Sequence, residues 1–442
     1  MHYRSPRRGA CRQRGVGVSK ARKGGWRDYV QLLSANRSYR SLWLGQVMSL
    51  TGDWFNVIAT ATLIQQLTGS SAHVGWLFAI RMLAPFVVSP FAGVVADRFD
   101  RRRILMAADV LRAGIVLCFL FVDEPGEVWL LYALTFAQLG LSGFFFPAYR
   151  ALLPQVASKE ELGTAIALGS ATWSTMLAVG AVTGGVVAGA FGVYPAFVLD
   201  SLTFVASVAF LARVRPQPRE STPVGGGLRR SIHEYLEGWR YLRRHVDIAL
   251  LALQKAANTL LVAGAFQVVQ VALTEQVFVI GKGGSTSLGI MWSTVGLGTG
   301  IGPILVRRYT GDDPRKLRRA LAVSYFVTGA GLVLVATASV FPVALVGALL
   351  RGVGAGVNWV FSTQLLLTLV PDRVRGRVFS TEFAMLTLCS SAGSALAGQA
   401  LELPSLGIRG TLWCMAGLVL LPGVLWTLWT LRHPVGLAVD ED

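Results

Sequence analysis

This sequence has few charged residues. Only 15% of its 442 residues are Asp, Glu, Lys or Arg and 53% are hydrophobic, whereas an average soluble domain carries roughly 25% charged residues. This composition excludes an ordinary soluble domain. A bilayer core of about 30 Å needs about 20 apolar residues per helix, and the chain holds many such stretches. We therefore predict an all-α, multi-pass integral protein of the cell inner (plasma) membrane.

Cysteine and histidine are also scarce. The four cysteines show no CxxC spacing, and three of them fall in apolar segments, so we interpret them as small core residues: Cys11, Cys118, Cys389 and Cys414. The five histidines are scattered, and the signatures GxxxxGK[ST], HExxH and GxSxG are absent. We expect neither an enzyme nor a cofactor or metal site. The energy source is then an ion gradient, the substrate's own gradient or a separate partner.

Long apolar windows divide the chain into two halves. The longest polar interruption, residues 213–246, leaves six windows on each side. The twelve predicted spanning helices are 41–66, 73–96, 104–122, 128–149, 163–189, 194–212, 248–273, 286–307, 319–338, 342–368, 378–401 and 410–431. The predicted domains are a basic cytoplasmic tail (1–40), an N-terminal six-helix bundle (41–213), a cytoplasmic linker (214–246), a C-terminal six-helix bundle (247–431) and a cytoplasmic tail (432–442). We expect a monomer.

The net charge of +17 reports orientation in the membrane. With these helices, only Lys282 and Arg409 lie on the outer side. Four more lie inside predicted helices, Arg81, Arg112, Lys255 and Arg351, and all others of the 41 Lys and Arg residues share one side. We therefore predict that both termini are cytoplasmic, and we expect no nucleic-acid partner.

Two basic segments lie outside the predicted helices. Residues 1–40 have no apolar core of the kind a signal peptide needs. They are interpreted as a disordered tail, with contact to anionic lipid headgroups as the alternative. In the linker, LRRSIHEYLEGWRYLRR (residues 228–244) combines an apolar stripe with many arginines. This pattern is typical of a helix lying at the membrane interface, and a regulatory partner site is the alternative.

A dense run of charge, GVVADRFDRRRIL (residues 93–105), lies in the short turn between helices 73–96 and 104–122. Gly93 lets two helices approach closely, and Asp97 can face the positive N-terminal end of a neighbouring helix. The alternative is that the charges only fix topology. The run resembles the loop signature of the major facilitator superfamily, which matches Gly93, Asp97, Arg98, Arg101, Arg102 and Arg103, whereas Asp100 replaces the usual glycine.

The resemblance extends from about residue 33 to 429. It is carried also by NRSYRSLWLGQVMSLTGDWF, FFFPAYRALLPQ, YPAFVLDSLTFVAS and VPDRVRGRVFS, and it is nearest to the drug:proton antiporter branch with macrolide-efflux proteins and the enterobactin exporter. It implies that Asp97 meets the helix that begins after Gly376 and Arg377, and that this contact latches the cytoplasmic gate. Glu382 is expected to belong to the same gate.

The two halves are related as a degenerate repeat. When Gly93 is matched with Gly302, GVVADRFDRRR lies beside GPILVRRYTGDDPRK, so that Arg98 meets Arg307 and Asp97 meets Val306. The predicted fold is the major facilitator fold, with twelve transmembrane helices in two six-helix pseudo-repeats. Such repeats place a substrate site near the membrane midplane between them.

Charges inside the predicted helices indicate that site, because each costs roughly 2.5–3.5 kcal/mol at the centre of a span. Asp53 lies about 18 Å from the inner end of helix 41–66, and Arg81 about 12 Å from the outer end of helix 73–96. Since these depths coincide in a ~30 Å core, we predict that the two pair or share a polar pocket. Asp53 is either a proton carrier or half of a permanent structural pair. Trp54 and Phe55 are expected to orient a substrate.

Other buried polar residues are weaker candidates. Asp109 and Arg112 are one turn apart and are interpreted as a local pair. Further candidates to line the cavity are Asp200, Lys255, Asn258 and Asn358. Arg351 opens RGVGAG, which resembles a motif that proton-driven exporters usually carry on the fourth helix, where this chain has Gln138. GAVTGG (residues 180–185) is similar to the antiporter motif, with Ala181 where proline is expected, and small residues also serve close helix packing.

These observations predict a secondary active transporter. We expect it to export amphipathic small molecules by alternating access, in antiport with protons across the bilayer. The resemblance implies drugs, macrolide-like antibiotics or siderophores, and hence a role in efflux and in multidrug or antibiotic resistance. The alternatives are a lipid or lysophospholipid flippase, and a membrane sensor or scaffold that transports nothing.

Overall fold

The computed structural model describes residues 26–158, 160–217 and 228–433. The greater part of the predicted tails and residues 218–227 of the linker lie outside this range. So do the side chains of Trp26, Gly93, Val94, Ala96, Asp97, Asp372 and residues 228–235. Within the described ranges the chain is almost wholly helical and has no strand, which confirms the predicted all-α fold.

Each predicted spanning window lies over a helix, and the ends differ by no more than two turns. The first half holds α2 (Arg37–Thr68), α3 (Ser71–Arg98), α4 (Arg101–Cys118), α5 (Val128–Val156), α6 (Leu162–Phe191) and α7 (Val193–Leu211). The second holds α9 (Val246–Asn258), the π-helical segment η3 (Thr259–Ala263), α10 (Gly264–Gln276), α11 (Ser285–Thr310), α12 (Pro314–Thr337), α13 (Phe341–Leu369), α14 (Asp372–Glu402) and α15 (Gly407–Arg432). Two further helices, α1 (Trp26–Ala35) and α8 (Leu228–Arg244), precede the halves.

Local sequence fixes where several of these helices begin. The Asn36 side chain accepts the Tyr39 N–H at 2.9 Å, and the Asp100 side chain accepts the Arg103 N–H at 2.8 Å. Each satisfies one of the backbone donors that the first turn of a helix leaves unpaired. At the other end of α2, Gly69 adopts the left-handed conformation (φ 62°) that only glycine takes without strain. The connections between helices can therefore be short.

Eleven of the described helical segments are long and apolar enough to cross a membrane. The remaining predicted span, α14, has 31 residues but a more polar sequence. It nevertheless packs beside α3, α10 and η3, so its polar residues contact protein. Polar side chains are tolerated in a spanning helix where neighbouring helices supply their partners.

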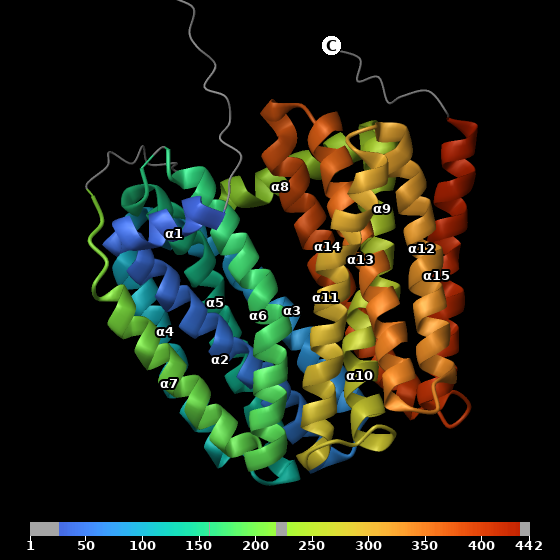
Figure 1. The fold of residues 1–442 in the computed structure, drawn as a ribbon, viewed down its shortest axis with the longest axis horizontal. Coiled ribbons are helices and arrows are strands. Elements are labelled where there is room, and N and C mark those ends of the chain that lie inside the picture. The colour runs from blue at the N-terminus through green and yellow to red at the C-terminus, as the bar shows by residue number, and fades with distance from the viewer. Residues whose placement is uncertain (1–25, 159, 218–227, 434–442) are drawn as a thin grey trace, which may run out of the picture.

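The two halves lie side by side and converge at one end (Figure 1). There the Thr62 and Ser285 hydroxyls are 3.0 Å apart, and the Ser391 hydroxyl donates to the Ala79 carbonyl at 3.1 Å. Glu402 of α14 also reaches across, accepting bonds from the Ser70 hydroxyl and, at 3.1 Å, from the Ala72 N–H. We call this the closed end.

Glycine makes the closest approach between the halves at the closed end. A Cβ added to Gly185 of α6 would lie 2.6 Å from the Ser285 carbonyl oxygen and 2.8 Å from Gly289 Cα of α11. A Cβ added to Gly75 of α3 would lie 2.7 Å from the Ser394 carbonyl oxygen. All three distances are too short for a real carbon contact, so only glycine allows these backbones to touch.

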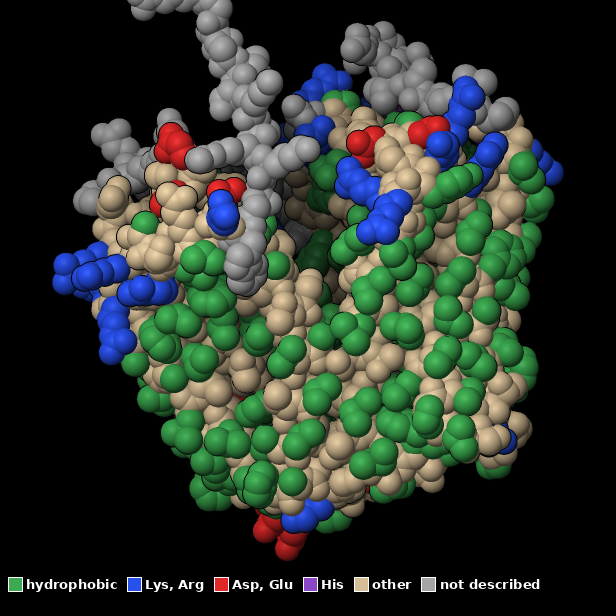
Figure 2. Space-filling view, in the orientation of Figure 1, with side chains coloured by type: hydrophobic (Ala, Val, Ile, Leu, Met, Phe, Trp, Pro, Cys, Tyr) green, Lys and Arg blue, Asp and Glu red, His purple; other side chains and the backbone are tan. Residues whose placement is uncertain are grey.

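The halves stand apart at the other end, which carries α1 and α8. Figure 2 shows a hollow between them there, with Lys and Arg side chains gathered around that end of the molecule. We call this the open end. The molecule is therefore asymmetric along its long axis, sealed at one end and hollow at the other.

Three sequence-based interpretations need correction. Residues 26–40 are not a disordered tail, because they form α1 and the start of α2, and Leu32 is buried against the first half. The described cysteines Cys118, Cys389 and Cys414 are free, but none is fully buried, so they are not core residues. The window 248–273 is not one regular helix, since η3 interrupts it where Gly393 and Gly264 pack against neighbouring backbone.

The linker helix α8 forms as predicted but does not lie on lipid alone. Leu236 and Trp239 are exposed, whereas Leu242 is buried in the core of the second half. Gly238 packs against the Arg377 backbone of α14, and the Glu237 carboxylate pairs with Arg377 at 2.8 Å. The helix is thereby fastened to the start of α14.

Candidate functional site

Five charged side chains interact in the interior of the first half: Asp53, Arg81, Asp109, Arg112 and Asp200. The centre of this cluster is Arg112 of α4, which forms an ion pair with Asp53 of α2 and lies 3.5 Å from Asp109 one turn earlier. Arg112 and Asp109 are fully buried, while the Asp53 side chain is 27% exposed. Asp53 is therefore the member that a ligand can reach.

Neighbouring helices hold this cluster in place. Arg112 donates to the Ser49 hydroxyl at 3.3 Å, and its guanidinium carbon lies 4.1 Å from the centre of the Phe204 ring. The Ser207 hydroxyl donates to Asp109 at 2.6 Å. Buried charges are tolerated only when they are paired and hydrogen-bonded, and α2, α4 and α7 supply these partners together. The predicted local pair of Asp109 and Arg112 is thus part of a larger network.

Of the two predicted alternatives, Asp53 and Arg81 share a polar region but do not form an ion pair with each other. Arg112 takes that place, and Arg81 of α3 donates instead to the Asn56 side chain at 3.4 Å. Arg81 is buried and interacts with Asp53 and Asp200 electrostatically. The depth of a residue along its helix does not determine which way its side chain faces.

Asp200 of α7, one of several sequence-based candidates to line the cavity, belongs to the charged cluster of the first half. Its side chain is fully buried, and neither carboxylate oxygen receives a close hydrogen bond in the described part of the chain. The Asn56 side chain and the charge of Arg112 nevertheless interact with it. Gly52 makes room for it, because a Cβ at this position would collide with Asp200 and Thr203. The signal in the sequence is an acidic residue in the middle of an apolar helix. Because burying a charge in a membrane costs free energy, such a residue is a functional candidate.

The second half has its own buried ion pair. Lys255 of α9 lies 3.0 Å from the Glu382 carboxylate of α14 and donates to the Thr363 hydroxyl at 2.9 Å. Its ammonium group is also 4.0 Å from the centre of the Trp359 ring, and that ring is half exposed. Glu382, expected at the gate, is instead paired inside the second half.

The other candidates in the second half are buried polar residues. Asn358 donates to the Gln254 side chain at 3.2 Å, and the Tyr325 hydroxyl bonds both the Gln254 carbonyl (2.9 Å) and its side chain. Asn258 is buried at the end of α9, directly before η3. Arg351 is buried against Phe266, 4.8 Å from its ring centre, and no acid pairs with it in the described ranges.

Aromatic side chains close the space between the halves near Asp53. The rings of Trp54 and Trp292 meet edge to face at 5.4 Å, and Phe78 stacks on Trp292 at 6.2 Å. Trp54 also covers Gly180, whereas Phe55 is buried against Gly184 inside the first half. Trp54 therefore lies at the contact of the halves, and Phe55 packs between α2 and α6.

The charged turn between α3 and α4 has mixed contacts. Arg98 and Arg103 are exposed, Arg101 is partly exposed, and Arg102 donates to the Leu211 carbonyl at 2.9 Å and to the Ala212 carbonyl. Arg102 thus satisfies the last carbonyls of α7. The surroundings of Gly93 and the side chain of Asp97 lie outside what the structure describes, so the predicted contact of Asp97 with α14 stays a prediction.

No group of three or more His, Cys, Asp or Glu residues in the described ranges is arranged to hold a metal ion. The charged residues that do gather are instead ion pairs between helices, one set in each half.

The molecule has two helical halves that are sealed at one end and hollow at the other, and each half holds buried charge. These features are typical of one class of protein, the polytopic membrane transporters. The model of the Major Facilitator Superfamily matches residues 42–380. The chain belongs to this superfamily, which confirms the resemblance seen in its motifs.

Several proteins resemble the chain over most of its length. The uncharacterized MFS-type transporter YfiS of Bacillus subtilis is 26% identical, over 89% of this chain and 94% of its own. The putative bacilysin exporter BacE of Bacillus subtilis is 27% identical (82% and 88%), and the enterobactin exporter EntS of Salmonella typhimurium is 25% identical (84% and 88%). Among solved structures, a bacterial homologue of the human lysosomal transporter Spinster superposes with a TM-score of 0.72 at 13% identity, covering 94% of this chain and all of that one.

Proposed function

We propose that this transporter exports amphipathic small molecules in exchange for protons, by alternating access. The observation that carries the proposal is the asymmetry of the halves, which touch through glycine at the closed end and part at the open end. The count of Lys and Arg supports a cytoplasmic position for both termini, and hence for the open end. On this orientation the structure is an inward-open state.

An amphipathic substrate suits the partly exposed aromatic and charged groups of the two halves. Asp53 is partly exposed beside Trp54, and Trp359 is half exposed over Lys255. Aromatic rings offer apolar contact, while the charged groups fix orientation. Two relatives are named as exporters, of bacilysin and of enterobactin, which supports the direction of transport. Drugs, macrolide-like antibiotics and siderophores remain the proposed classes.

Proton coupling rests on the acids of the first half. Asp53 is tied to Arg112, so it is held as one partner of an ion pair. Asp200 is fully buried, and no donor in the described chain makes a close hydrogen bond to its oxygens, although the Asn56 side chain and the charges of Arg112 and Arg81 interact with it. A buried carboxyl group without a close hydrogen bond is costly as an anion, so Asp200 is the stronger candidate to bind and release a proton. We therefore propose Asp200, in place of Asp53, as the proton carrier.

Transport into proteoliposomes with an imposed pH gradient tests this proposal. With erythromycin, enterobactin and ethidium as probes, the gradient is expected to accelerate uptake of at least one probe several-fold in the wild type. Asp200→Asn should lose this acceleration but keep exchange of probe across the membrane without a gradient, because an amide cannot carry a proton.

Asp53→Asn is the matched comparison. It should weaken both gradient-driven uptake and exchange without a gradient, because Arg112 then loses its ion-pair partner. Gradient-driven uptake that survives Asp200→Asn would remove Asp200 as the carrier. No movement of any probe by the wild type would count against this substrate range, and flipping of a fluorescent lipid in the same vesicles would favour a flippase.

We also propose that Asp97 closes the open end by meeting the start of α14 in the opposite state. In the observed state, Arg377 near that start is paired with Glu237 of α8. Asp97→Ala is expected to remove most transport in the vesicle assay while expression and membrane insertion stay normal, because only one conformation is weakened. Loss of insertion instead would indicate that the charged turn serves topology alone.

A further inference from the structure

A basic groove lies on the outside of the first half at the open end, away from the hollow between the halves. Its volume is about 410 Å³, and eight residues of α2, α7 and the segment after α7 line it: Arg37, Ser38, Arg40, Ser41, Leu44, Phe210, Arg213 and Arg215. Four of the eight are arginines, all exposed, and none is acidic. Such a groove attracts an anion.

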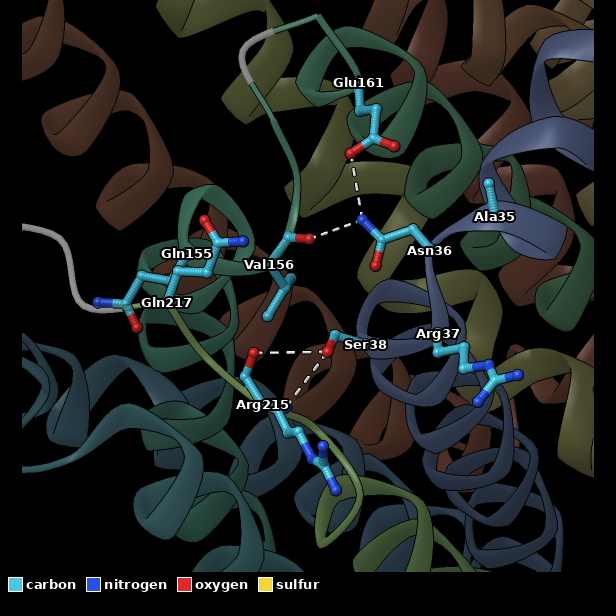
Figure 3. Close-up of a pocket in the computed structure, with 9 residues that line it drawn as sticks. All are labelled: Ala35, Asn36, Arg37, Ser38, Gln155, Val156, Glu161, Arg215 and Gln217. Carbon is cyan, nitrogen blue, oxygen red and sulfur yellow. Dashed lines mark hydrogen bonds between the residues drawn. The ribbon is translucent and has the colours of Figure 1, made fainter.

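Contacts on both sides fix the shape of this groove. The Ser38 hydroxyl bonds the backbone of Arg215, accepting from its N–H and donating to its carbonyl, each at 3.4 Å (Figure 3). Arg102 caps the carbonyls of Leu211 and Ala212 from α4. On the other side, Asn36 caps α2 and donates to the Val156 carbonyl at 2.8 Å. The arginines are therefore carried by backbone that is tied down at several points.

A second pocket of about 430 Å³ adjoins the groove and shares Arg37, Ser38 and Arg215 with it (Figure 3). Glu161 lines this second pocket, where it accepts a bond from Asn36 at 3.1 Å. Its carboxylate is thus engaged by Asn36, and no ion pair joins it to Arg37 or Arg215 in the described ranges. Among the described residues, no acid pairs with the four arginines of the groove.

The depth of the groove favours a lipid. The candidate spans Arg37–Thr68 and Val193–Leu211 have their ends beside its arginines, where the headgroup region is expected. Below them, α7 exposes Val198, Leu202 and Val205, which recur at helical spacing on one face. The same face continues through Ala209 and Ala212, which are also exposed, to the end of α7 beside Arg213.

We propose that the groove between α2 and α7 binds the phosphate of an anionic membrane lipid. The guanidinium groups of Arg37, Arg40, Arg213 and Arg215 surround the phosphate, since arginine pairs with phosphate through fixed, bidentate bonds. The acyl chains lie along the exposed face of α7. The groove is distinct from the hollow that serves transport, and its occupant is a resident of the bilayer.

Native mass spectrometry of the purified protein tests this site. The protein is freed of lipid in detergent and titrated with phosphatidylglycerol, phosphatidylcholine or inorganic phosphate. Phosphatidylglycerol is expected to bind most tightly. Arg37→Gln/Arg213→Gln should raise its apparent Kd about 30-fold, which corresponds to about 1 kcal/mol for each arginine near a headgroup.

The matched control is Arg315→Gln/Arg319→Gln, which removes two exposed arginines from α12 at the same end of the molecule. It should bind phosphatidylglycerol as the wild type does, and both double variants should unfold at the wild-type temperature without lipid. Equal loss in both variants, or wild-type binding by the groove variant, would overturn the site. Equal binding of phosphatidylcholine, or of inorganic phosphate alone, would overturn an anionic lipid as the ligand.

Discussion

Replacing Gly185 with leucine is expected to abolish transport by keeping the closed end apart. A side chain at this position meets the Ser285 carbonyl and Gly289 Cα of the opposite half at less than 3 Å, and neither backbone atom can rotate away. The variant should therefore avoid the observed conformation and accumulate in one that is open at the Gly185 end. Transport requires both states, so uptake by proteoliposomes should fall to background.

Distances between spin labels distinguish this trapping from simple misfolding. Glu124 and Lys282 are exposed on opposite halves at the closed end, and labels there should move apart in Gly185→Leu compared with the wild type. Gly163→Leu is the matched control, because Gly163 lies on the same helix with open space around it. Wild-type transport by Gly185→Leu would show that the glycine contact is not required.

Removing Arg112 is expected to destabilise the protein more than any other single change in the first half. Arg112→Gln leaves Asp109 buried beside a neutral group and deprives Asp53 of its partner. Breaking a buried ion pair from one side costs about 3–5 kcal/mol. Chemical unfolding in detergent should therefore show a loss of this order.

A double variant separates charge from shape. In Arg112→Gln/Asp109→Asn the orphaned buried charge is also removed, so part of the lost stability should return. Arg409→Gln, at an exposed position, should change the free energy of unfolding by no more than about 0.5 kcal/mol. An Arg112→Gln variant as stable as the wild type would contradict the central place of Arg112 in the cluster.

The fold could be predicted from the sequence because hydropathy reports it directly. Apolar windows marked every spanning helix, and the charged turns between them marked the two halves. The four Lys and Arg residues inside predicted helices, Arg81, Arg112, Lys255 and Arg351, are all buried in the structure. These side chains are buried in the protein because an unpaired charge that faces lipid is strongly disfavoured.

The partners of these charges could not be predicted in the same way. Distance along a helix gives the depth of a residue, but the direction of its side chain depends on how the helix is rotated against its neighbours. Asp53 and Arg81 agree in depth, yet Arg112 on a third helix faces Asp53 and Arg81 faces Asn56. Glu382 was likewise assigned to the gate by its depth, although it faces Lys255.

The π-helical segment η3 could not be predicted from the sequence pattern either. The apolar periodicity of residues 248–273 continues through η3, so nothing in it signals a π-helical turn. The cause lies in tertiary packing, where Gly393 brings the α14 backbone against Leu260 and Gly264 packs against Ser390. A single chain read alone contains no record of such contacts between distant segments.

Glu402 completes a helix that belongs to the other half of the molecule. Its carboxylate accepts the Ala72 N–H and the Ser70 hydroxyl at the start of α3, where a negative charge also faces the positive end of the helix dipole. When the halves separate there, α3 must exchange this cap for water. The resting protein thus favours the observed state by roughly 0.3–1 kcal/mol from this contact alone, and a substrate that drives the cycle must overcome that preference on every turnover.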